Sequence, residues 1–60
     1  MGRIVKIINK ESGKALDVHR PDINKNGAKV HQWDYHGGDN QLWDVEDRGG
    51  GKFSIKNHEN

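Results

Sequence analysis

Three residue types in this sequence could together hold a ligand that carries several hydroxyl groups. The carboxylate of Asp17 can accept hydrogen bonds from two neighbouring hydroxyls, and its charge strengthens each bond. The indole of Trp33 offers an apolar platform for the C–H face of a ring. The amide of Asn40 both donates and accepts, which suits a hydroxyl that does the same. The simpler alternatives are a solvated strand carboxylate, a Trp33 packed inward against Trp43, and an amide that satisfies loop backbone.

Two further aromatic or imidazole side chains lie close to these in the sequence. Side chains alternate along a strand, so His31 and Trp33, two residues apart, share one face. Tyr35 follows two positions later and is either a substitute platform or a packing residue. Trp43 is predicted to lie in the core, because large aromatic side chains dominate small cores.

Metal and catalytic chemistry have weaker support. The four histidines lack the spacing of a zinc site, and cysteine is absent, so neither a metal nor a cofactor is expected. Glycoside hydrolysis needs two carboxylates across a cleft, and nothing places two of Asp17, Asp39 and Asp44 in that way. The segment Gly49-Gly50-Gly51-Lys52 does not have the spacing of a phosphate-binding loop. The sequence therefore favours a binding protein over an enzyme.

Size and composition limit the architecture that can position these residues. A chain of 60 residues is one domain at most and buries only about 60% of its unfolded surface. Hydrophobic residues make up 30%, and no disulfide can reinforce so small a core. The net charge is +1 with both signs interspersed, which predicts neither nucleic-acid binding nor membrane insertion. No N-terminal run resembles a signal peptide, and the cellular location stays open.

Short alternating stretches predict an all-β chain, because glycine, proline or Asn/Asp clusters interrupt it about every ten residues. Turns are expected at 11–14, 21–27, 37–40 and 49–51. If Leu16 and Val18 face the core, alternation points Asp17 outward. The predicted strands are Ile4–Lys10, Leu16–Val18, Ala28–Val30, Trp43–Val45 and Phe53–Asn57.

The two ends of the chain are weakly repeated. Residues 5–11 (VKIINKE) and 53–59 (FSIKNHE) lie 48 positions apart and share two apolar positions, an Asn and a Glu. This pattern indicates that residues 1–60 hold one structural repeat, in which 52–60 repeats the first strand.

An ordered set of motifs covers nearly the whole chain and resembles one repeat of a ricin B-type lectin that has no cysteines. The set is LDV at 16–18, NGAKV at 26–30, Trp33, GGDNQLW at 37–43 and FSIKN at 53–57. The family's Gln-x-Trp signature falls on Gln41-Leu42-Trp43. The resemblance implies a β-trefoil, a fold of twelve strands in three repeats, of which this chain supplies one.

The resemblance also implies a sugar site for galactose-type glycans. It makes Asp17 and Asn40 the sugar ligands and Trp33 the platform, with Gln41 supporting the site and its turn. His31 stands where many members of the family have glutamine. Gly38 and Asp39 are secondary candidates, because their backbone could contact the sugar near the same site, and Tyr35 is a third as a substitute platform.

One repeat cannot bury its apolar face alone, whereas stacked repeats can. The simplest closure is a homotrimer of identical single-repeat chains, which would complete the β-trefoil and could hold a cation on its threefold axis. Three chains of five predicted strands have more strands than the twelve of a β-trefoil. The predicted strands 4–10 and 53–57 would therefore compete for equivalent positions in the fold.

The leading functional interpretation is a lectin module whose weak sugar binding becomes multivalent in the trimer. The alternative is a structural or engineered β-trefoil building block with a vestigial sugar site. Protein binding through the trefoil surface, and a chain disordered until it joins its missing repeats, remain as further alternatives.

Overall fold

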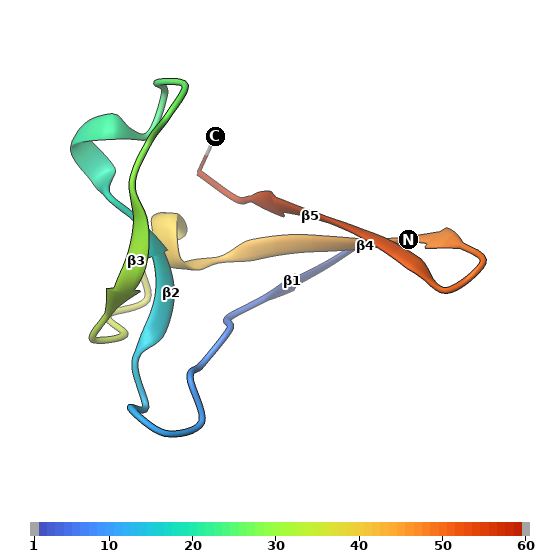
Figure 1. Cartoon of the computed structure of the whole chain (residues 1–60), viewed down its shortest axis with the longest axis horizontal. Coiled ribbons are helices and arrows are strands. Elements are labelled where there is room, and N and C mark those ends of the chain that lie inside the picture. Colours follow the sequence, from blue (N-terminus) through green and yellow to red (C-terminus); the bar gives the residue numbers. More distant parts are fainter. Residues whose placement is uncertain (1, 60) are drawn as a thin grey trace.

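The computed structural model describes residues 2–59, which form five strands and two short 3₁₀ helices (Figure 1). No α-helix occurs in this range, and the all-β prediction is confirmed. No helix in the described part of the chain is long and apolar enough to cross a membrane. The elements are β1 Gly2–Val5, β2 Ala15–Val18, η1 Arg20–Asp22, β3 Val30–Trp33, η2 Asp39–Gln41, β4 Trp43–Gly49 and β5 Lys52–Asn57.

The strands form two separate antiparallel sheets. One contains β1, β4 and β5, with β4 in the middle, and the other pairs β2 with β3. In Figure 1 the hairpin of β4 and β5 extends away from the β2–β3 pair. Its turn is the glycine run 49–51, in which all three φ angles are positive, from 61° to 82°. Residues other than glycine rarely adopt such backbone angles, which explains why this turn consists of glycine.

The apolar core is very small. Its buried hydrophobic residues in the described range are Ala15, Val18 and Trp43. The indole Nε1 of Trp43 donates to the carbonyl of Leu16 at 3.1 Å, so this residue ties β4 to β2. The prediction that Trp43 lies in the core is confirmed, and this side chain joins the two sheets.

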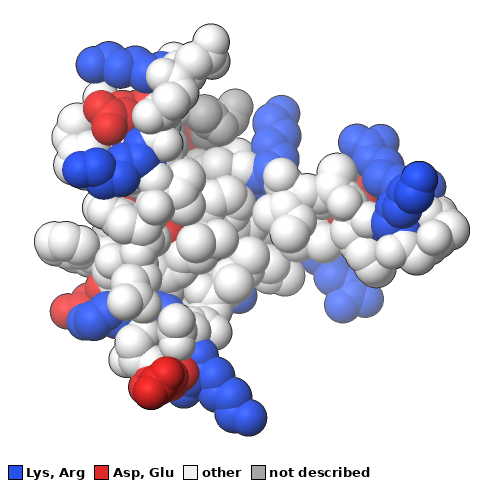
Figure 2. Space-filling model, in the orientation of Figure 1, with Lys and Arg blue, Asp and Glu red and all other residues white. Residues whose placement is uncertain are grey.

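Much of the remaining apolar surface lies open on one face of the larger sheet. Val45 pairs with Ile55, and Phe53 pairs with Asp47 two residues further along β4. These residues share the face of Trp43, because side chains alternate along each strand. Phe53 is 62% exposed and Ile55 is 57% exposed. The face seen in Figure 2 carries few charged side chains between the outer end of the hairpin and the β2–β3 pair.

The first predicted strand, Ile4–Lys10, is too long at its C-terminal end. β1 ends at Val5, and the chain then joins β2 through a bridge between Ile8 and Ala15. The Oδ1 of Asn9 accepts the backbone N–H groups of Glu11 and Ser12, which starts the turn predicted at 11–14.

The third predicted strand, Ala28–Val30, lies too early in the sequence. The observed strand β3 begins at Val30, which is paired with Val18, and it ends at Trp33, which is paired with Ala15. The pairing partner therefore sets the boundary, and β2 offers pairing positions only from Ala15 to Val18.

Lys14 and Asp34 flank the paired strands β2 and β3. The Nζ of Lys14 lies 2.8 Å from Oδ1 of Asp34. This hydrogen bond and the positive charge lower the pKa of Asp34 below its ordinary value of 3.8. A lowered pKa in the folded state means that the contact stabilises the fold above the unfolded pKa. The stabilisation is lost as the pH falls through the folded pKa.

We expect Lys14→Gln to raise the pKa of Asp34 back toward 3.8, because both causes of the shift are removed. A carboxyl NMR titration of the folded chain measures this pKa directly. Lys25→Gln is the matched control and should leave the pKa unchanged. An Asp34 that titrates identically in the wild type and in Lys14→Gln would show that the contact does not persist in solution.

Candidate functional site

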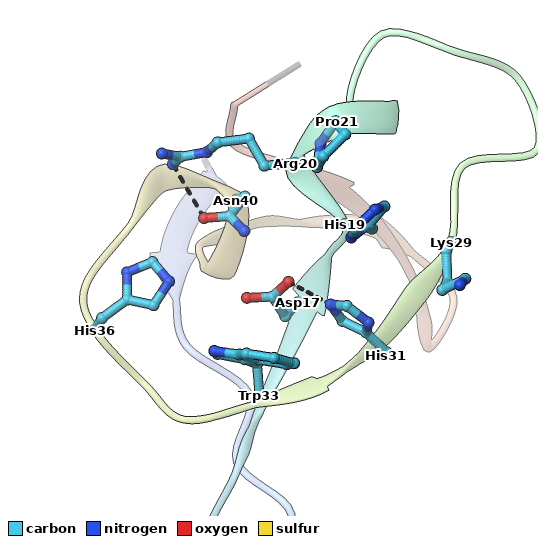
Figure 3. Close-up of a pocket in the computed structure, with 9 residues that line it drawn as sticks. All are labelled: Asp17, His19, Arg20, Pro21, Lys29, His31, Trp33, His36 and Asn40. Carbon is cyan, nitrogen blue, oxygen red and sulfur yellow. Dashed lines mark hydrogen bonds and ion pairs between the residues drawn. The ribbon is translucent and has the colours of Figure 1, made fainter.

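An open cavity of about 450 Å³ lies beside the β2–β3 pair, between β3 and the two 3₁₀ helices (Figure 3). Four of the five principal residues predicted from the sequence line it, namely Asp17, His31, Trp33 and Asn40. Strand register explains why three of them meet. Asp17 pairs directly with His31, and Trp33 lies two residues further along the same face of β3.

Asp17 lines the cavity, but it does not point freely into solvent as alternation alone predicted. It is only 3% exposed, because β3 lies beside it and η2 packs against β2. Its Oδ1 lies 2.9 Å from Nε2 of His31. Its Oδ2 has no partner among residues 2–59 and remains available as an acceptor for a ligand.

Trp33 presents its ring to the cavity. It is 58% exposed, so the alternative that it packs inward against Trp43 is wrong. The His31 ring lies against it in a stacked arrangement, with centroids 5.7 Å apart and planes at 27°. Figure 3 shows the indole below the Asp17 carboxylate, with open space between the indole, Asn40 and His36. His31 therefore supports both the platform and the carboxylate.

Asn40 lies in η2 and is 4% exposed. Its Nδ2 donates to the carbonyl of Val18 at 3.0 Å, and its Oδ1 accepts from Nη2 of Arg20 at 3.1 Å. The amide therefore satisfies a carbonyl of strand β2, not the loop backbone that the simpler interpretation proposed, and it also borders the cavity. These two contacts leave one hydrogen on Nδ2, so Asn40 acts toward a ligand chiefly as a donor.

Gln41 is fully buried and does not line the cavity. Its Nε2 donates to the carbonyl of Asp34 at 2.8 Å, and its Oε1 accepts from the N–H of His36 at 2.9 Å. Both partners belong to the loop between β3 and η2. Gln41 therefore fixes the path of the chain that follows Trp33 and carries the His36 ring to the cavity.

The three secondary candidates do not line the cavity. Tyr35 lies under the ammonium group of Lys6, at 4.6 Å from the ring centroid, and Asp39 is exposed at the start of η2. Gly38 matters for a steric reason. A Cβ at this position would lie 2.6 Å from both Cε1 of His36 and Oδ1 of Asn40. The glycine allows these two side chains to approach the same end of the cavity.

Sequence reasoning missed five lining residues, which are His19, Arg20, Pro21, Lys29 and His36. Four of them lie outside the motifs that carry the resemblance, and Lys29 lies within the NGAKV segment. The sequence signal that could have identified His19, Arg20, Pro21 and His36 is their position next to the motifs. Residues 19–21 directly follow the LDV segment, and His36 precedes the GGDNQLW segment. Within residues 2–59, no three His, Asp or Glu side chains are grouped so that they could hold a metal ion.

The family model described as "Ricin-type beta-trefoil lectin domain-like" matches residues 2–60. The chain belongs to the ricin-type β-trefoil lectin family. Membership indicates carbohydrate binding, and lectin domains of this family are typically non-catalytic. Searches of the curated proteins and of the solved structures found no match for this ricin-type chain.

We expect Gln41→Ala to lower the free energy of unfolding of this lectin domain by about 1–3 kcal/mol. The change leaves the carbonyl of Asp34 and the N–H of His36 without their buried partner. Urea unfolding followed by tryptophan fluorescence measures the loss. Gln32→Ala is the control, because Gln32 is exposed and, among residues 2–59, its side chain accepts a single hydrogen bond, from the hydroxyl of Ser12. Equal losses in the two variants would contradict a positioning role for Gln41.

Proposed function

We propose that this chain is a lectin module that binds galactose-type glycans through the cavity beside β2 and β3. The observation that carries the proposal is the meeting of three groups in one open cavity. These are the exposed ring of Trp33, the Asp17 carboxylate and the Asn40 amide. A sugar ring has an apolar C–H face and a rim of hydroxyls, and it needs complementary groups of both kinds.

The hydrogen-bonding capacity left in the site favours a pair of neighbouring hydroxyls. Oδ2 of Asp17 can accept from one or both of them, and the remaining hydrogen of Asn40 can donate to one. His31 holds the carboxylate at 2.9 Å, and Val18 and Arg20 hold the amide. Side chains held in this way lose little conformational freedom when a ligand binds.

The proposed affinity of a single site is low. The cavity is open and offers few polar contacts, so we expect a Kd on the order of mM, which corresponds to about −4 kcal/mol. Binding to a surface rich in glycans then depends on several sites carried by one body. Three sites on a homotrimer would supply that valency.

Homotrimerisation is supported by the unfinished core. Residues 2–59 bury three apolar residues and leave Phe53 and Ile55 open on the face of the larger sheet that carries Trp43. Two more copies of the same face, arranged around a threefold axis, would cover it. The family fold is built from three repeats, and this chain supplies one.

The proposal that 52–60 repeats the first strand is supported by two observations. β1 and β5 flank opposite edges of β4 and run in the same direction. The side chains of Asn9 and Asn57 each accept the backbone N–H two residues later, from Glu11 and Glu59. Because β1 and β5 occupy both edges of β4, ring closure in a trimer would replace one of them with a strand of the neighbouring chain.

The sugar site is tested with Asp17→Asn. This change preserves the shape of the buried side chain, whereas Asp17→Ala would leave a void and remove the partner of His31. We expect at least a tenfold loss of lactose affinity, measured by ligand-observed NMR, because a charged acceptor is removed.

Asp44→Asn is the matched control, since Asp44 is also paired with a histidine, His58, at 3.2 Å but lies outside the cavity. Lactose binding that is unchanged in Asp17→Asn would overturn the site. A trimer that forms while lactose leaves Trp33 fluorescence unperturbed would instead support the building-block alternative.

The assembly is tested with Ile55→Glu. Native mass spectrometry of the wild type should show a species near three times 6.8 kDa. We expect Ile55→Glu to abolish this species, because the change places a charge on the face proposed to be buried. Lys56→Glu, on the opposite face of the same strand, should retain it. A wild-type chain that is monomeric at micromolar concentration would contradict the trimer.

A further inference from the structure

The cavity wall is predominantly basic. Among its nine lining residues are two permanent cations, Arg20 and Lys29, and three histidines, whereas Asp17 is its single carboxylate. Oδ1 of that carboxylate is already engaged by His31. Oδ2 of Asp17 suffices for a hydroxyl ligand, so neutral sugar binding leaves this excess of positive and hydrogen-donating groups unexplained.

Two of the basic groups stand together at one end of the cavity. Figure 3 shows Arg20 above Asn40 and His36 beside it, on the side away from His31. Gly38 permits this arrangement, because any side chain there would collide with the His36 ring and with the Asn40 amide. A sugar that rests on Trp33 and bonds to Asp17 and Asn40 would lie next to this end, so that a substituent on the ring edge facing Asn40 would reach Arg20 and His36.

Arg20 keeps donors available for such a substituent. Its Nη2 donates to Asn40 and contacts Glu59 at 2.8 Å, whereas Nη1 and Nε have no partner in the described range. Glu59 lies outside the cavity lining and offsets part of the charge. The His36 ring makes no hydrogen bond within residues 2–59, and its backbone N–H is held by Gln41. A guanidinium beside an imidazole suits an oxyanion with several acceptor atoms.

We propose that the site prefers galactosides with an acidic substituent, a sulfate or a carboxylate, which Arg20 and His36 bind at the end of the cavity next to Asn40. This inference rests on the proposed function, since it assumes that the sugar ring lies on Trp33. A sulfate and a carboxylate share the required chemistry, which is an anionic group attached to the sugar within reach of both Arg20 and His36.

The test compares three ligands by ligand-observed NMR at about 20 mM and at about 500 mM salt. The probes are lactose, lactose 3′-sulfate and 3′-sialyllactose. We expect at least one acidic ligand to bind about fivefold more tightly than lactose at low salt. The preference should shrink at high salt, because contacts between exposed charges are screened. The sulfate and sialyl arms identify which acidic group is accepted.

Two variants assign that preference to the proposed residues. Arg20→Gln should remove most of it, and His36→Gln, which alters an exposed ring, should reduce it. Because Arg20 also holds Asn40, the readout is the ratio of acidic to neutral affinity and not either affinity alone. Lys52→Gln, at the outer end of the β4–β5 hairpin, removes the same charge elsewhere and should leave the ratio unchanged.

The outcomes separate the two proposals. Lactose binding without preference for either acidic ligand overturns this inference and leaves the lectin site intact. A preference that persists in both Arg20→Gln and His36→Gln also overturns it. If none of the three ligands binds, the proposed function itself fails and this inference fails with it.

Discussion

The scarcity of apolar residues makes two buried amide side chains the central constraint of this structure. Only Ala15, Val18 and Trp43 form the buried apolar core among residues 2–59, and Asn40 and Gln41 are as buried as they are. An amide buried at this depth must be hydrogen-bonded, and each of these bonds the backbone of another element. Asn40 and Gln41 therefore attach η2 to β2 and to the loop after β3. The cavity keeps its shape because these bonds hold its walls.

The same constraint links the proposed site to the proposed assembly. When polar side chains occupy many of the buried positions, their hydrogen bonds fix a few groups precisely, but burial contributes little hydrophobic stabilisation. The apolar residues that could supply more, such as Phe53 and Ile55, lie on an open sheet face. In a trimer these residues would be buried between chains, while the β2–β3 pair would keep its cavity accessible. The proposed trimer would then both stabilise the fold and provide several sugar sites.

The cavity combines a part that suits a neutral sugar ring with a basic part. Trp33, Asp17 and Asn40 suit a sugar ring, and they are the residues that the family resemblance indicates. Arg20 and His36 lie outside the motifs, yet motif residues contact both: Gly38 and Gln41 position His36, and Asn40 accepts a hydrogen bond from Arg20. The motif thus places residues that lie outside it at the cavity. Selectivity for the sugar ring and selectivity for its substituents can therefore reside in different segments of the chain.

The sequence by itself determined the strand content, the turns at 11–14 and 49–51, the buried Trp43 and four of the residues that line the cavity. These follow from the alternation of apolar and polar residues, from the preference of glycine and asparagine for turns, and from the spacing of the ordered motifs. Only the tertiary structure decided the ends of the first and third strands, because pairing with β4 ends the first at Val5 and pairing with β2 sets the bounds of the third. It also decided that Asp17 is buried against His31 and that Arg20 and His36 border the cavity. Asp17 and His31 are 14 positions apart, Arg20 and Asn40 are 20 apart, and His36 is held in place by Gln41. No local sequence pattern encodes contacts of this kind.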